Sequence, residues 1–530
     1  MTSGVTGGSA GDVLVLGGGH NGLVAAILAA TAGRSVTLLE RADRPGGATV
    51  GERVFPPHPV RLSRYAYLVA LMPDELIRRL GISVPLASRA VSSYTPVLRD
   101  GVATGLLVER HRGPATEQSF RELTGSGEDF AAWRQLYAEL ETFARVVAPT
   151  LTGPLRRRHE VKDAVIAAAG SQIWTDLVEE PIGAMIERRF ADDTVRGVVA
   201  TDALIGTHTS LFAADLLANR CFLYHLIGRG TGEWLVPIGG MGAVSDALIR
   251  RARELGVEIV CDTEVLDIAE GGSAVTVTGT RDGAEFTMSA PHLLAAIAPA
   301  VLDRCLGRET EDPVGAQIKV NMLLDRLPRL KSGVDPRVAF AGTMHLNEEL
   351  SELEAAYAIS RAGTLPAVVP SEVYCHSLTD PTIMNGHPGA TLTLFGLHTP
   401  IDLFRADPAA ARAAAAQAAL IALQKHLAEP LLDCLARDAD GEPCVDIASP
   451  LDLEGSLNMP GGNIFHDDLS WPWLADGFPA DGPAAAYGVE VPGSRRILLA
   501  GAGSRRGGGV SGLGGAAAVD ALLEMTGGTT

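Results

Sequence analysis

The stretch Asp12-Val-Leu-Val-Leu-Gly17-Gly-Gly19-His-Asn-Gly22 decides the fold of this 530-residue chain. An apolar strand runs into a glycine turn, an alanine-rich helix follows, and a second strand, 35–39, ends on Glu40. Gly17 permits the tight turn, Gly19 lets a pyrophosphate approach the backbone, and Gly22 lets helix and strand pack closely. The spacing predicts a βαβ unit with dinucleotide phosphates at the helix N-terminus.

Two further features extend this fingerprint. Glu40 lies about 20 residues beyond the glycines, where its carboxylate can accept hydrogen bonds from a ribose 2'-hydroxyl and would repel a 2'-phosphate. Gly46 and Gly47 follow in a turn-rich segment and allow a second close approach of the backbone to a ligand. The pattern favours an extended dinucleotide.

Composition argues against several classes of protein. The formal net charge of −19 disfavours a nucleic-acid partner, because phosphate backbones select basic faces. The longest apolar run, 23–30, is less than half of the roughly 20 residues that a membrane span needs, so no integral span is expected. Residues 1–11 lack the charge and apolar core of a secretory signal and are expected to be a disordered lead-in. We expect a cytoplasmic protein, with peripheral membrane docking and a homodimer left open.

The cysteines occur singly and form no CxxC pair. This pattern argues against a dithiol redox centre and against a zinc site, and no metal site is predicted. We expect buried, reduced thiols at Cys221, Cys261, Cys305, Cys375, Cys434 and Cys444.

The length predicts two or more domains, since one domain takes about 100 to 200 residues. The pattern after residue 73 is mostly helical, and a second inserted segment holds alternating strands and a long helix, 408–427, capped by Asp407. Glycine turns with a strand and a helix recur near residues 239 and 501. We predict a nucleotide domain built from 1–72, 235–302 and 491–530, and a substrate domain built from 73–234 and 303–490.

The order of these pieces resembles the family of FAD-dependent oxidoreductases related to phytoene desaturase. The likeness is nearest to the branch that contains pyridine nucleotide-disulphide oxidoreductase domain-containing protein 2. It rests on segments spread over nearly the whole chain: 61–67 (RLSRYAY), 239–243 (GGMGA), 377–381 (SLTDP), 461–466 (GGNIFH), 501–503 (GAG) and 507–512 (GGGVSG).

The resemblance implies an α/β fold with a Rossmann-like, glutathione-reductase-type FAD-binding domain, discontinuous in sequence, and an inserted mixed α+β substrate domain. FAD would extend from the first fingerprint toward a glycine-rich C-terminal turn beside the flavin ring. The implied cofactor-binding residues are Gly17, Gly19, His20, Asn21, Gly22, Glu40, Arg41, Gly46, Gly47, Ala48, Thr49, Val265, Gly503, Gly508, Gly509, Val510 and Ser511.

Candidate residues for the chemistry are sparse. His466 is the best candidate for a general base or an orienting donor, because imidazole exchanges protons near neutral pH. Tyr65, Tyr67 and Arg64 could line the substrate pocket. A solitary histidine or tyrosine near a domain junction is more often structural, and aromatic residues make up only 5% of the chain, which offers no obvious stacking platform.

The chain departs from the family pattern before its last glycines, where relatives commonly carry His-Pro and this sequence has Arg505-Arg506. One hypothesis is that an arginine contacts the FAD phosphates or an anionic substrate group; the alternative is a solvent-facing pair. The 239–242 turn lacks GxGxxG spacing and a predicted preceding strand, which argues against an NAD(P)H site.

We therefore expect hydride transfer from a mainly apolar small molecule to flavin N5, with reoxidation by oxygen, a quinone or another acceptor. Two alternatives stay open. One is a redox-neutral polyene isomerase or a saturase, and the other is a flavin-binding regulatory protein without turnover.

Overall fold

The computed structural model describes residues 6–9 and 11–528 of the chain. The segments predicted to build the nucleotide domain form a five-stranded parallel sheet at its centre. The strands come from three separated segments of the sequence, in the spatial order β10 (Glu258–Val260), β3 (Val36–Leu39), β2 (Val13–Leu16), β14 (His292–Ala295) and β20 (Ile497–Leu499). Distant parts of the sequence thus build one sheet.

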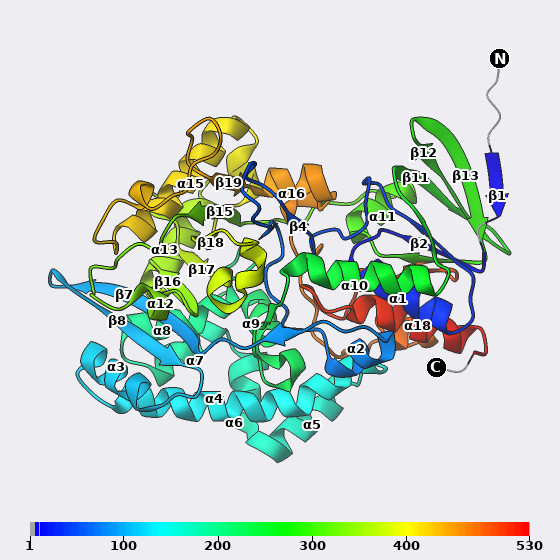
Figure 1. The fold of residues 1–530 in the computed structure, drawn as a ribbon. Coiled ribbons are helices and arrows are strands. Elements are labelled where there is room, and N and C mark those ends of the chain that lie inside the picture. Colours follow the sequence, from blue (N-terminus) through cyan, green and yellow to red (C-terminus); the bar gives the residue numbers. More distant parts are fainter. Residues whose placement is uncertain (1–5, 10, 529–530) are drawn as a thin grey trace.

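Alternating side chains of β2 pack into two different layers. Val13 and Val15 enter the core that three helices form over one face of the sheet, whereas Leu14 and Leu16 face the opposite layer. The helices are α1 (His20–Thr31), α10 (Met241–Glu254) and α18 (Leu513–Met525). The opposite layer holds α11 (Pro299–Cys305) and the antiparallel strands β11 (Thr263–Glu270), β12 (Val275–Arg281) and β13 (Ala284–Ala290). This layering is Rossmann-like, as predicted, and Figure 1 shows it on the right.

The N-terminal prediction of a disordered lead-in is wrong for residues 6–9. These residues form β1 (Thr6–Ser9), which pairs in parallel with β13 and extends its sheet. The backbone groups of an edge strand can accept such an added strand, whatever the added side chains are. The rest of the predicted lead-in, apart from Gly11, lies outside the described residues.

A seven-stranded mixed sheet forms the second large unit. The 73–229 segment is expected to be mostly helical, yet it contains a hairpin that joins this sheet. The first strand of the hairpin, Val91–Arg99, pairs in parallel with the strand Thr343–Leu346. Such pairing between distant segments depends on tertiary contacts and leaves no local signal. The spatial order is β19 (Val445–Ala448), β15 (Ile318–Leu324), β18 (Ala390–Gly396), β17 (Ser371–Tyr374), β16 (Thr343–Leu346), β7 (Val91–Arg99) and β8 (Val102–Glu109).

Helices cover this sheet and form a separate layer below it (Figure 1). Asp407 caps α15 as predicted, because its side chain accepts a hydrogen bond from the Ala410 N–H at 3.1 Å. The helices packed with the sheet are α12 (Pro336–Ala339), α13 (Leu350–Arg361) and α15 (Pro408–Gln424). The lower layer comprises α3 (Pro114–Thr124), α4 (Glu128–Val147), α5 (Arg158–Ala169), α6 (Ser171–Trp174), α7 (Ile182–Arg189), α8 (Asp193–Ala200) and α9 (Leu217–Ile227).

Short elements complete the described chain. The core of the predicted nucleotide domain includes a few residues that the sequence assigned to the substrate domain. These residues lie in the helix Asp74–Leu80 and at Tyr487 and Val489. A two-residue strand, β9, precedes the glycine turn at 239, where the sequence predicted none. The remaining elements are α2 (Asp74–Leu80), α14 (His376–Thr379), α16 (Pro450–Leu457), α17 (Pro483–Ala486), β4 (Gly51–Glu52), β5 (Leu62–Ser63), β6 (Leu86–Ala87) and β9 (Val236–Pro237).

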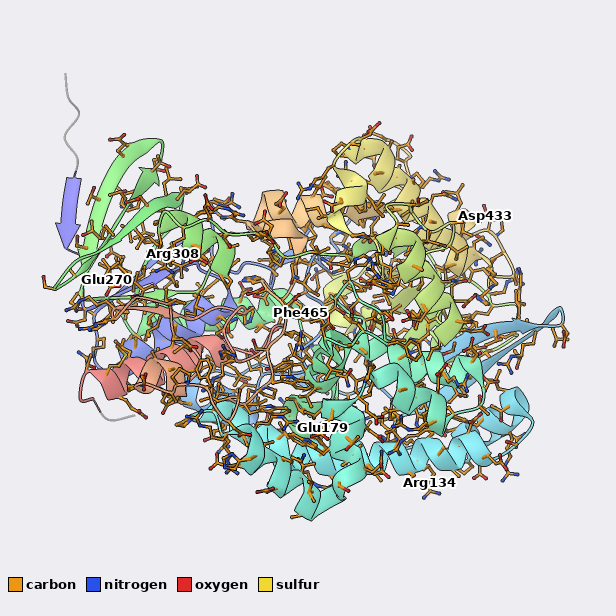
Figure 2. All side chains as sticks on the ribbon, turned by 180° about the vertical axis from the view of Figure 1, so that it is seen from behind. Arg134, Glu179, Glu270, Arg308, Asp433 and Phe465 are labelled. Atoms are coloured by element: carbon orange, nitrogen blue, oxygen red, sulfur yellow. The ribbon has the colours of Figure 1, made fainter. Side chains whose placement is uncertain are left out.

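The cysteine side chains confirm the expectation of free thiols, and the expectation of burial holds for all of them except Cys261, which is half-buried. No helix within the described ranges is long and apolar enough to cross a membrane. Figure 2 shows the labelled charged residues, such as Arg134 and Glu179, on outer elements, whereas Phe465 lies near the middle of the molecule.

The two arginines before the last glycines have structural contacts. Arg506 is fully buried and donates to the carbonyl oxygens of Tyr487 at 2.7 Å and Leu151 at 3.0 Å. Arg505 pairs with Glu490 at 3.4 Å and lies over the ring of Phe478. The alternative of a solvent-facing pair is wrong for Arg506, which joins the helical layer to the C-terminal segment. The contact with FAD phosphates or an anionic substrate group stays a hypothesis.

We predict that Arg506→Met lowers the free energy of unfolding by about 3 kcal/mol, because two buried carbonyl groups lose a charged donor. Urea unfolding followed by near-ultraviolet circular dichroism measures the loss. Arg505→Met is the matched control and should cost less than about 1 kcal/mol, since its ion pair is partly exposed. Equal losses for the two variants would contradict the structural assignment.

Candidate functional site

A cavity of about 510 Å³ runs from the glycine fingerprint to the seven-stranded sheet. Both large units and the helical layer contribute to its wall, so the cavity lies where the segments of the chain meet. The predicted site residues that line it are Gly17, Gly19, His20, Asn21, Glu40, Arg41, Gly47, Ala48, Arg64, Tyr65, Tyr67, Val265, His466, Gly509 and Val510.

The backbone of the first glycine turn is open toward this cavity. A Cβ built on Gly19 would have no described atom within 4 Å, whereas one on Gly22 would lie 1.9 Å from the Gly17 carbonyl oxygen. Gly17 has a φ of +98°, which favours glycine. Within the described residues the start of α1 has no side-chain cap and no acidic residue in its first turn. Its N–H groups thus offer an anion site.

Glu40 is held rigidly beside this turn. Its Oε2 accepts a hydrogen bond from the Gly18 N–H at 2.7 Å, and its Oε1 accepts one from the Ala42 N–H at 2.8 Å. The Glu40 carbonyl accepts from the Thr263 N–H at 2.9 Å, which brings the start of β11 and Val265 to the same end of the cavity. A carboxylate oxygen accepts more than one hydrogen bond, so both oxygens can still receive hydroxyl donors.

Other predicted cofactor-binding residues lie behind the cavity wall and support it. The Gly46 N–H donates to the Gly18 carbonyl at 2.9 Å, and the Thr49 hydroxyl donates to the Gly46 carbonyl at 2.7 Å. A Cβ on Gly508 would lie 2.1 Å from the Phe465 ring. Close packing explains these glycines without ligand contact. The predicted residues that do not line the cavity are Gly22, Gly46, Thr49, Gly503, Gly508 and Ser511.

Two histidines, His20 and His466, lie where α1 approaches the C-terminal glycine turn. His20 Nε2 lies 3.1 Å from the Gly509 carbonyl oxygen, and this contact ties α1 to the C-terminal glycine turn. His466 has a φ of +69°, a strained value for a residue with a side chain, and its buried Nδ1 has no hydrogen-bond partner among the described residues. Burial lowers the pKa of both imidazoles to about 4. His466 is therefore neutral near pH 7 and is better suited to orienting a ligand than to accepting its proton.

Sequence reasoning missed Lys319, which lines the cavity from a strand that is otherwise apolar apart from Asn321. Its ammonium donates to the carbonyl oxygens of Ser63 at 2.6 Å and Tyr65 at 2.7 Å, and it lies 4.9 Å from the Tyr67 ring centroid. Burial lowers the Lys319 pKa well below its ordinary value. The signal in the sequence was a lysine at the start of a buried strand, where an unpaired charge is costly.

Arg64 anchors the same turn from the other side. Its guanidinium pairs with Glu52 at 3.2 Å and Asp446 at 3.3 Å, and it lies over the Tyr65 ring. Because Lys319 holds the carbonyl of Tyr65 and Arg64 covers its ring, the turn has little freedom to move. The predicted pocket residues are thus fixed by charged partners.

The cavity gathers aromatic side chains despite the low aromatic content of the chain. Tyr67 and Phe395 have ring centroids 5.9 Å apart, and His225 stacks on Trp234 at 4.8 Å. Phe465 completes the aromatic lining. These residues come from distant segments, and only the tertiary structure brings them together.

The geometry fits a bound dinucleotide. Asn21 Oδ1 is buried without a hydrogen-bond partner in the described chain, beside the open backbone of Gly19. A pyrophosphate suits the N-terminus of α1, and ribose hydroxyls suit the carboxylate of Glu40. The aromatic and apolar walls at the other end suit a flat ring system.

Acid is predicted to destabilise the protein through its buried histidines. Burial lowers the pKa of His225 to about 4, so the unfolded chain binds more protons than the folded chain below pH 6.5. The stability that each neutral, buried histidine contributes is fully present above pH 6.5. As the pH falls toward 4, the free energy of unfolding decreases by up to about 3 kcal/mol per histidine. Urea unfolding at several pH values measures it. His225→Gln should flatten this dependence, and an unchanged slope would contradict the assignment.

Comparison with known proteins finds similar chains. Residues 12–118 match the family described as FAD dependent oxidoreductase. The uncharacterized protein Rv0897c of Mycobacterium tuberculosis is 44% identical over 527 residues, and the alignment covers 97% of each chain. Pyridine nucleotide-disulfide oxidoreductase domain-containing protein 2 of Mus musculus is 28% identical, over 95% of this chain and 92% of the mouse protein.

Solved structures share the fold. Cyclohexylamine oxidase from Brevibacterium oxydans superposes with a TM-score of 0.55 at 16% identity, over 98% of this chain and 99% of that enzyme. An oxidoreductase from Methanosarcina mazei gives a TM-score of 0.55 at 14% identity, over 97% of this chain and 100% of the other. Identities this low establish the fold alone. With the relatives above, the chain belongs to the FAD-dependent oxidoreductase family, and its cofactor is FAD.

Proposed function

We propose that this protein removes hydride from a mainly apolar organic substrate, as a dehydrogenase, a desaturase or an oxidase, and passes the electrons to oxygen, a quinone or another acceptor. Bound FAD supplies the hydride acceptor, flavin N5. The observation that carries the proposal is the aromatic and aliphatic lining of the cavity beyond the glycine turn. This lining includes Tyr67, Leu68, Leu71, Ile205, His225, Trp234, Phe395, Met459, Ile464 and Phe465.

We infer the placement of FAD from the two ends of the cavity. The open turn at Gly19 would take the pyrophosphate and Glu40 the adenosine ribose, with Val265 beside the adenine. Gly509 and Val510 would then lie beside the flavin ring. The link from His20 to the Gly509 carbonyl supports this placement, because it sets the C-terminal turn against the phosphate end of α1.

In this reaction the side chains of the protein hold and orient the substrate. A hydride leaves the substrate carbon, and any accompanying proton must leave from a neighbouring atom of the substrate. In our proposal His466 orients the substrate by a hydrogen bond from its neutral imidazole, while Tyr65 and Tyr67 form the wall that Lys319 and Arg64 hold in place. The aromatic walls exclude water from the reacting atoms.

Gly19→Ala tests the cofactor placement. The methyl group meets no described protein atom, so the variant should fold, yet it would occupy the space proposed for the pyrophosphate. We predict an FAD dissociation constant raised at least about tenfold, or about 1.4 kcal/mol, measured by titration of the apoprotein. Gly153→Ala is the matched control, because its Cβ also meets no described atom and its φ is negative. Unchanged affinity in Gly19→Ala would overturn the placement.

Anaerobic spectroscopy tests the reaction. The holoenzyme is mixed with apolar amines, alcohols and polyenes, and we predict that at least one class reduces the flavin. NADH and NADPH should not reduce it rapidly, because the 239–242 turn lacks the GxGxxG spacing expected of a separate NAD(P)H-binding unit. His466→Gln should slow substrate-driven reduction by roughly tenfold or more without releasing FAD.

Three outcomes would contradict this function. Rapid reduction by NADH or NADPH would establish a pyridine nucleotide as the reductant. An isomerised or saturated product that requires reduced flavin would favour a polyene isomerase or a saturase. Inertness toward the whole panel would favour a flavin-binding regulatory protein.

A further inference from the structure

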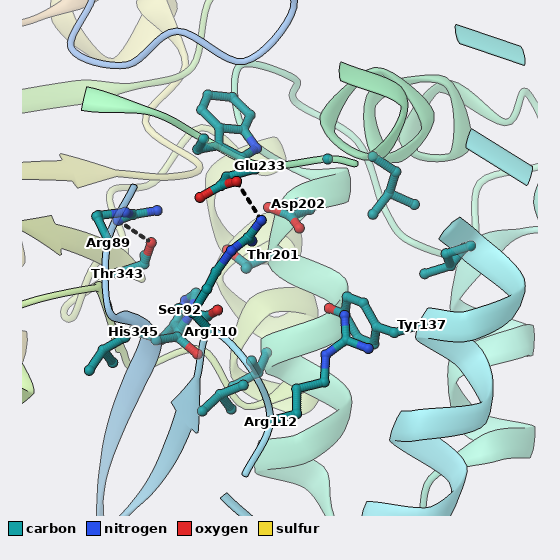
Figure 3. A pocket seen from close by; sticks show the side chains of 18 of the residues that line it. Arg89, Ser92, Arg110, Arg112, Tyr137, Thr201, Asp202, Glu233, Thr343 and His345 are labelled. Atoms are coloured by element: carbon teal, nitrogen blue, oxygen red, sulfur yellow. Dashed lines mark hydrogen bonds and ion pairs between the residues drawn. The ribbon is translucent and has the colours of Figure 1, made fainter. Parts of the chain in front are cut away.

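A second cavity of about 160 Å³ adjoins the first, with Ile205 and Trp234 in the lining of both and with Tyr67 and Tyr374 in the wall between them. Their ring centroids are 5.0 Å apart, and only Tyr374 lines the second cavity. Figure 3 shows Arg89, Asp202 and His345 around this space, with Arg110 paired to Glu233 at 2.6 Å. The proposed flavin chemistry uses none of these side chains.

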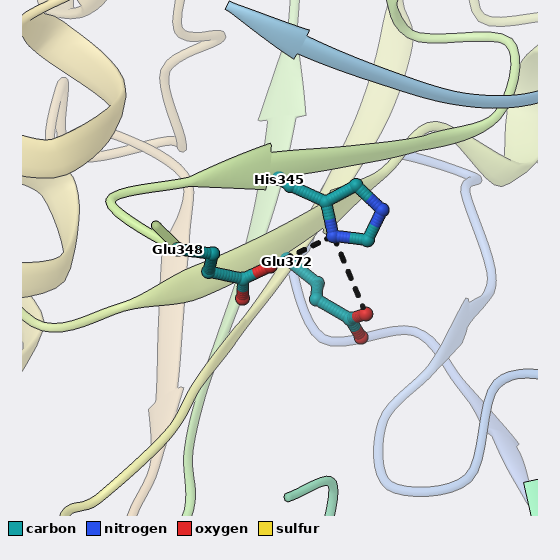
Figure 4. Close-up of side chains that lie close together, drawn as sticks. All are labelled: His345, Glu348 and Glu372. Atoms are coloured by element: carbon teal, nitrogen blue, oxygen red, sulfur yellow. Dashed lines mark hydrogen bonds and ion pairs between the residues drawn. The ribbon is translucent and has the colours of Figure 1, made fainter. Parts of the chain in front are cut away.

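One corner of this region holds three buried side chains with metal-ligating atoms (Figure 4). His345 Nδ1 lies 2.7 Å from Glu348 Oε2 and 3.8 Å from Glu372 Oε1. The ligating atoms of the three side chains all lie within 4.8 Å of one another. Their side chains are at most 6% exposed.

The backbone fixes this arrangement. His345 and Glu372 are directly opposite each other in the antiparallel pair β16–β17, so their side chains share one face of the sheet. Asn347, just after β16, has a φ of +55°, and this left-handed turn brings Glu348 back toward His345. The cluster therefore does not depend on flexible surface residues.

One carboxylate oxygen of the cluster, Glu348 Oε1, has no hydrogen-bond partner within the described chain, although its side chain is fully buried. A buried oxygen without a partner costs free energy, and a cation bound by the Glu348 carboxylate would reduce that cost.

We propose that His345, Glu348 and Glu372 bind one divalent transition-metal ion, such as Zn²⁺ or Mn²⁺. Bonds of about 2.1 Å in a tetrahedral site separate neighbouring ligand atoms by about 3.4 Å, and the observed separations of 2.7 and 3.8 Å bracket that value. One imidazole nitrogen with carboxylate oxygens suits these ions. The sequence argument against zinc concerned cysteine pairs, which this cluster does not use.

The ion would brace the wall of the flavin cavity. It would join the turn after β16 to β17, and Tyr374 at the end of β17 donates to Glu372 at 2.5 Å and packs against Tyr67. The site itself does not reach the larger cavity, because none of its three ligands lines that space. This role is independent of which substrate the flavin oxidises.

Metal binding to the untagged, FAD-loaded protein tests the proposal, because a polyhistidine tag would itself bind metal. After chelator treatment, Mn²⁺ is titrated with electron paramagnetic resonance of the free ion as readout, and Zn²⁺ is measured by equilibrium dialysis. We predict one site per chain for at least one of the two ions. Glu348→Gln and Glu372→Gln, which keep the side-chain shape, should weaken binding more than roughly 100-fold, since even outer-shell changes cost 10–100-fold.

Glu233→Gln is the matched control, because Glu233 lines the same cavity but pairs with Arg110. It should keep the metal affinity of the parent chain. The bound ion should also raise the thermal midpoint of the parent and of Glu233→Gln, but not of Glu348→Gln. Binding of neither Mn²⁺ nor Zn²⁺ at one per chain, or unchanged binding in both amide variants, would overturn the proposal.

Discussion

The close contact between the start of α1 and the end of β2 is the constraint on which the site depends. At Gly22 the helix backbone lies so near the Gly17 carbonyl that a Cβ would sit 1.9 Å from the oxygen. This approach leaves the backbone of Gly19 open and aims the first N–H groups of α1 into the cavity. The same helix packs against α10 and α18, so the anion site is as rigid as the core beneath it.

Around this contact, the structure joins residues that are far apart in the sequence. The bond between His20 and Gly509 spans nearly the whole chain, and Lys319 of the seven-stranded sheet holds the turn at Ser63 and Tyr65. The first link joins α1 to the C-terminal glycine turn, and the second sets the seven-stranded sheet against the N-terminal segment. The cavity between them therefore has a defined shape, which hydride transfer requires because the donor carbon must be held near its acceptor.

In the described residues, the buried lysine and arginine side chains donate hydrogen bonds to oxygen atoms. Arg506 and Lys319 both donate to backbone carbonyl oxygens. The cluster of His345, Glu348 and Glu372 is the reverse case, because the buried Glu348 Oε1 has no donor within the described chain. The proposed metal ion would be the cation that partners the carboxylate oxygens of this cluster.

The sequence by itself determined the local elements, and its family resemblance gave the cofactor. The glycine spacing from Gly17, the acid at Glu40 and the cap at Asp407 act through neighbouring residues, so the βαβ unit and the helix start were predictable. FAD followed from the resemblance of segments spread over nearly the whole chain. Only the tertiary structure decided which distant groups meet. It placed the β7–β8 hairpin in the seven-stranded sheet, buried Arg506 against the carbonyl oxygens of Tyr487 and Leu151, and set His345 opposite Glu372. Strand register and burial create these contacts through long-range packing, which no local pattern specifies.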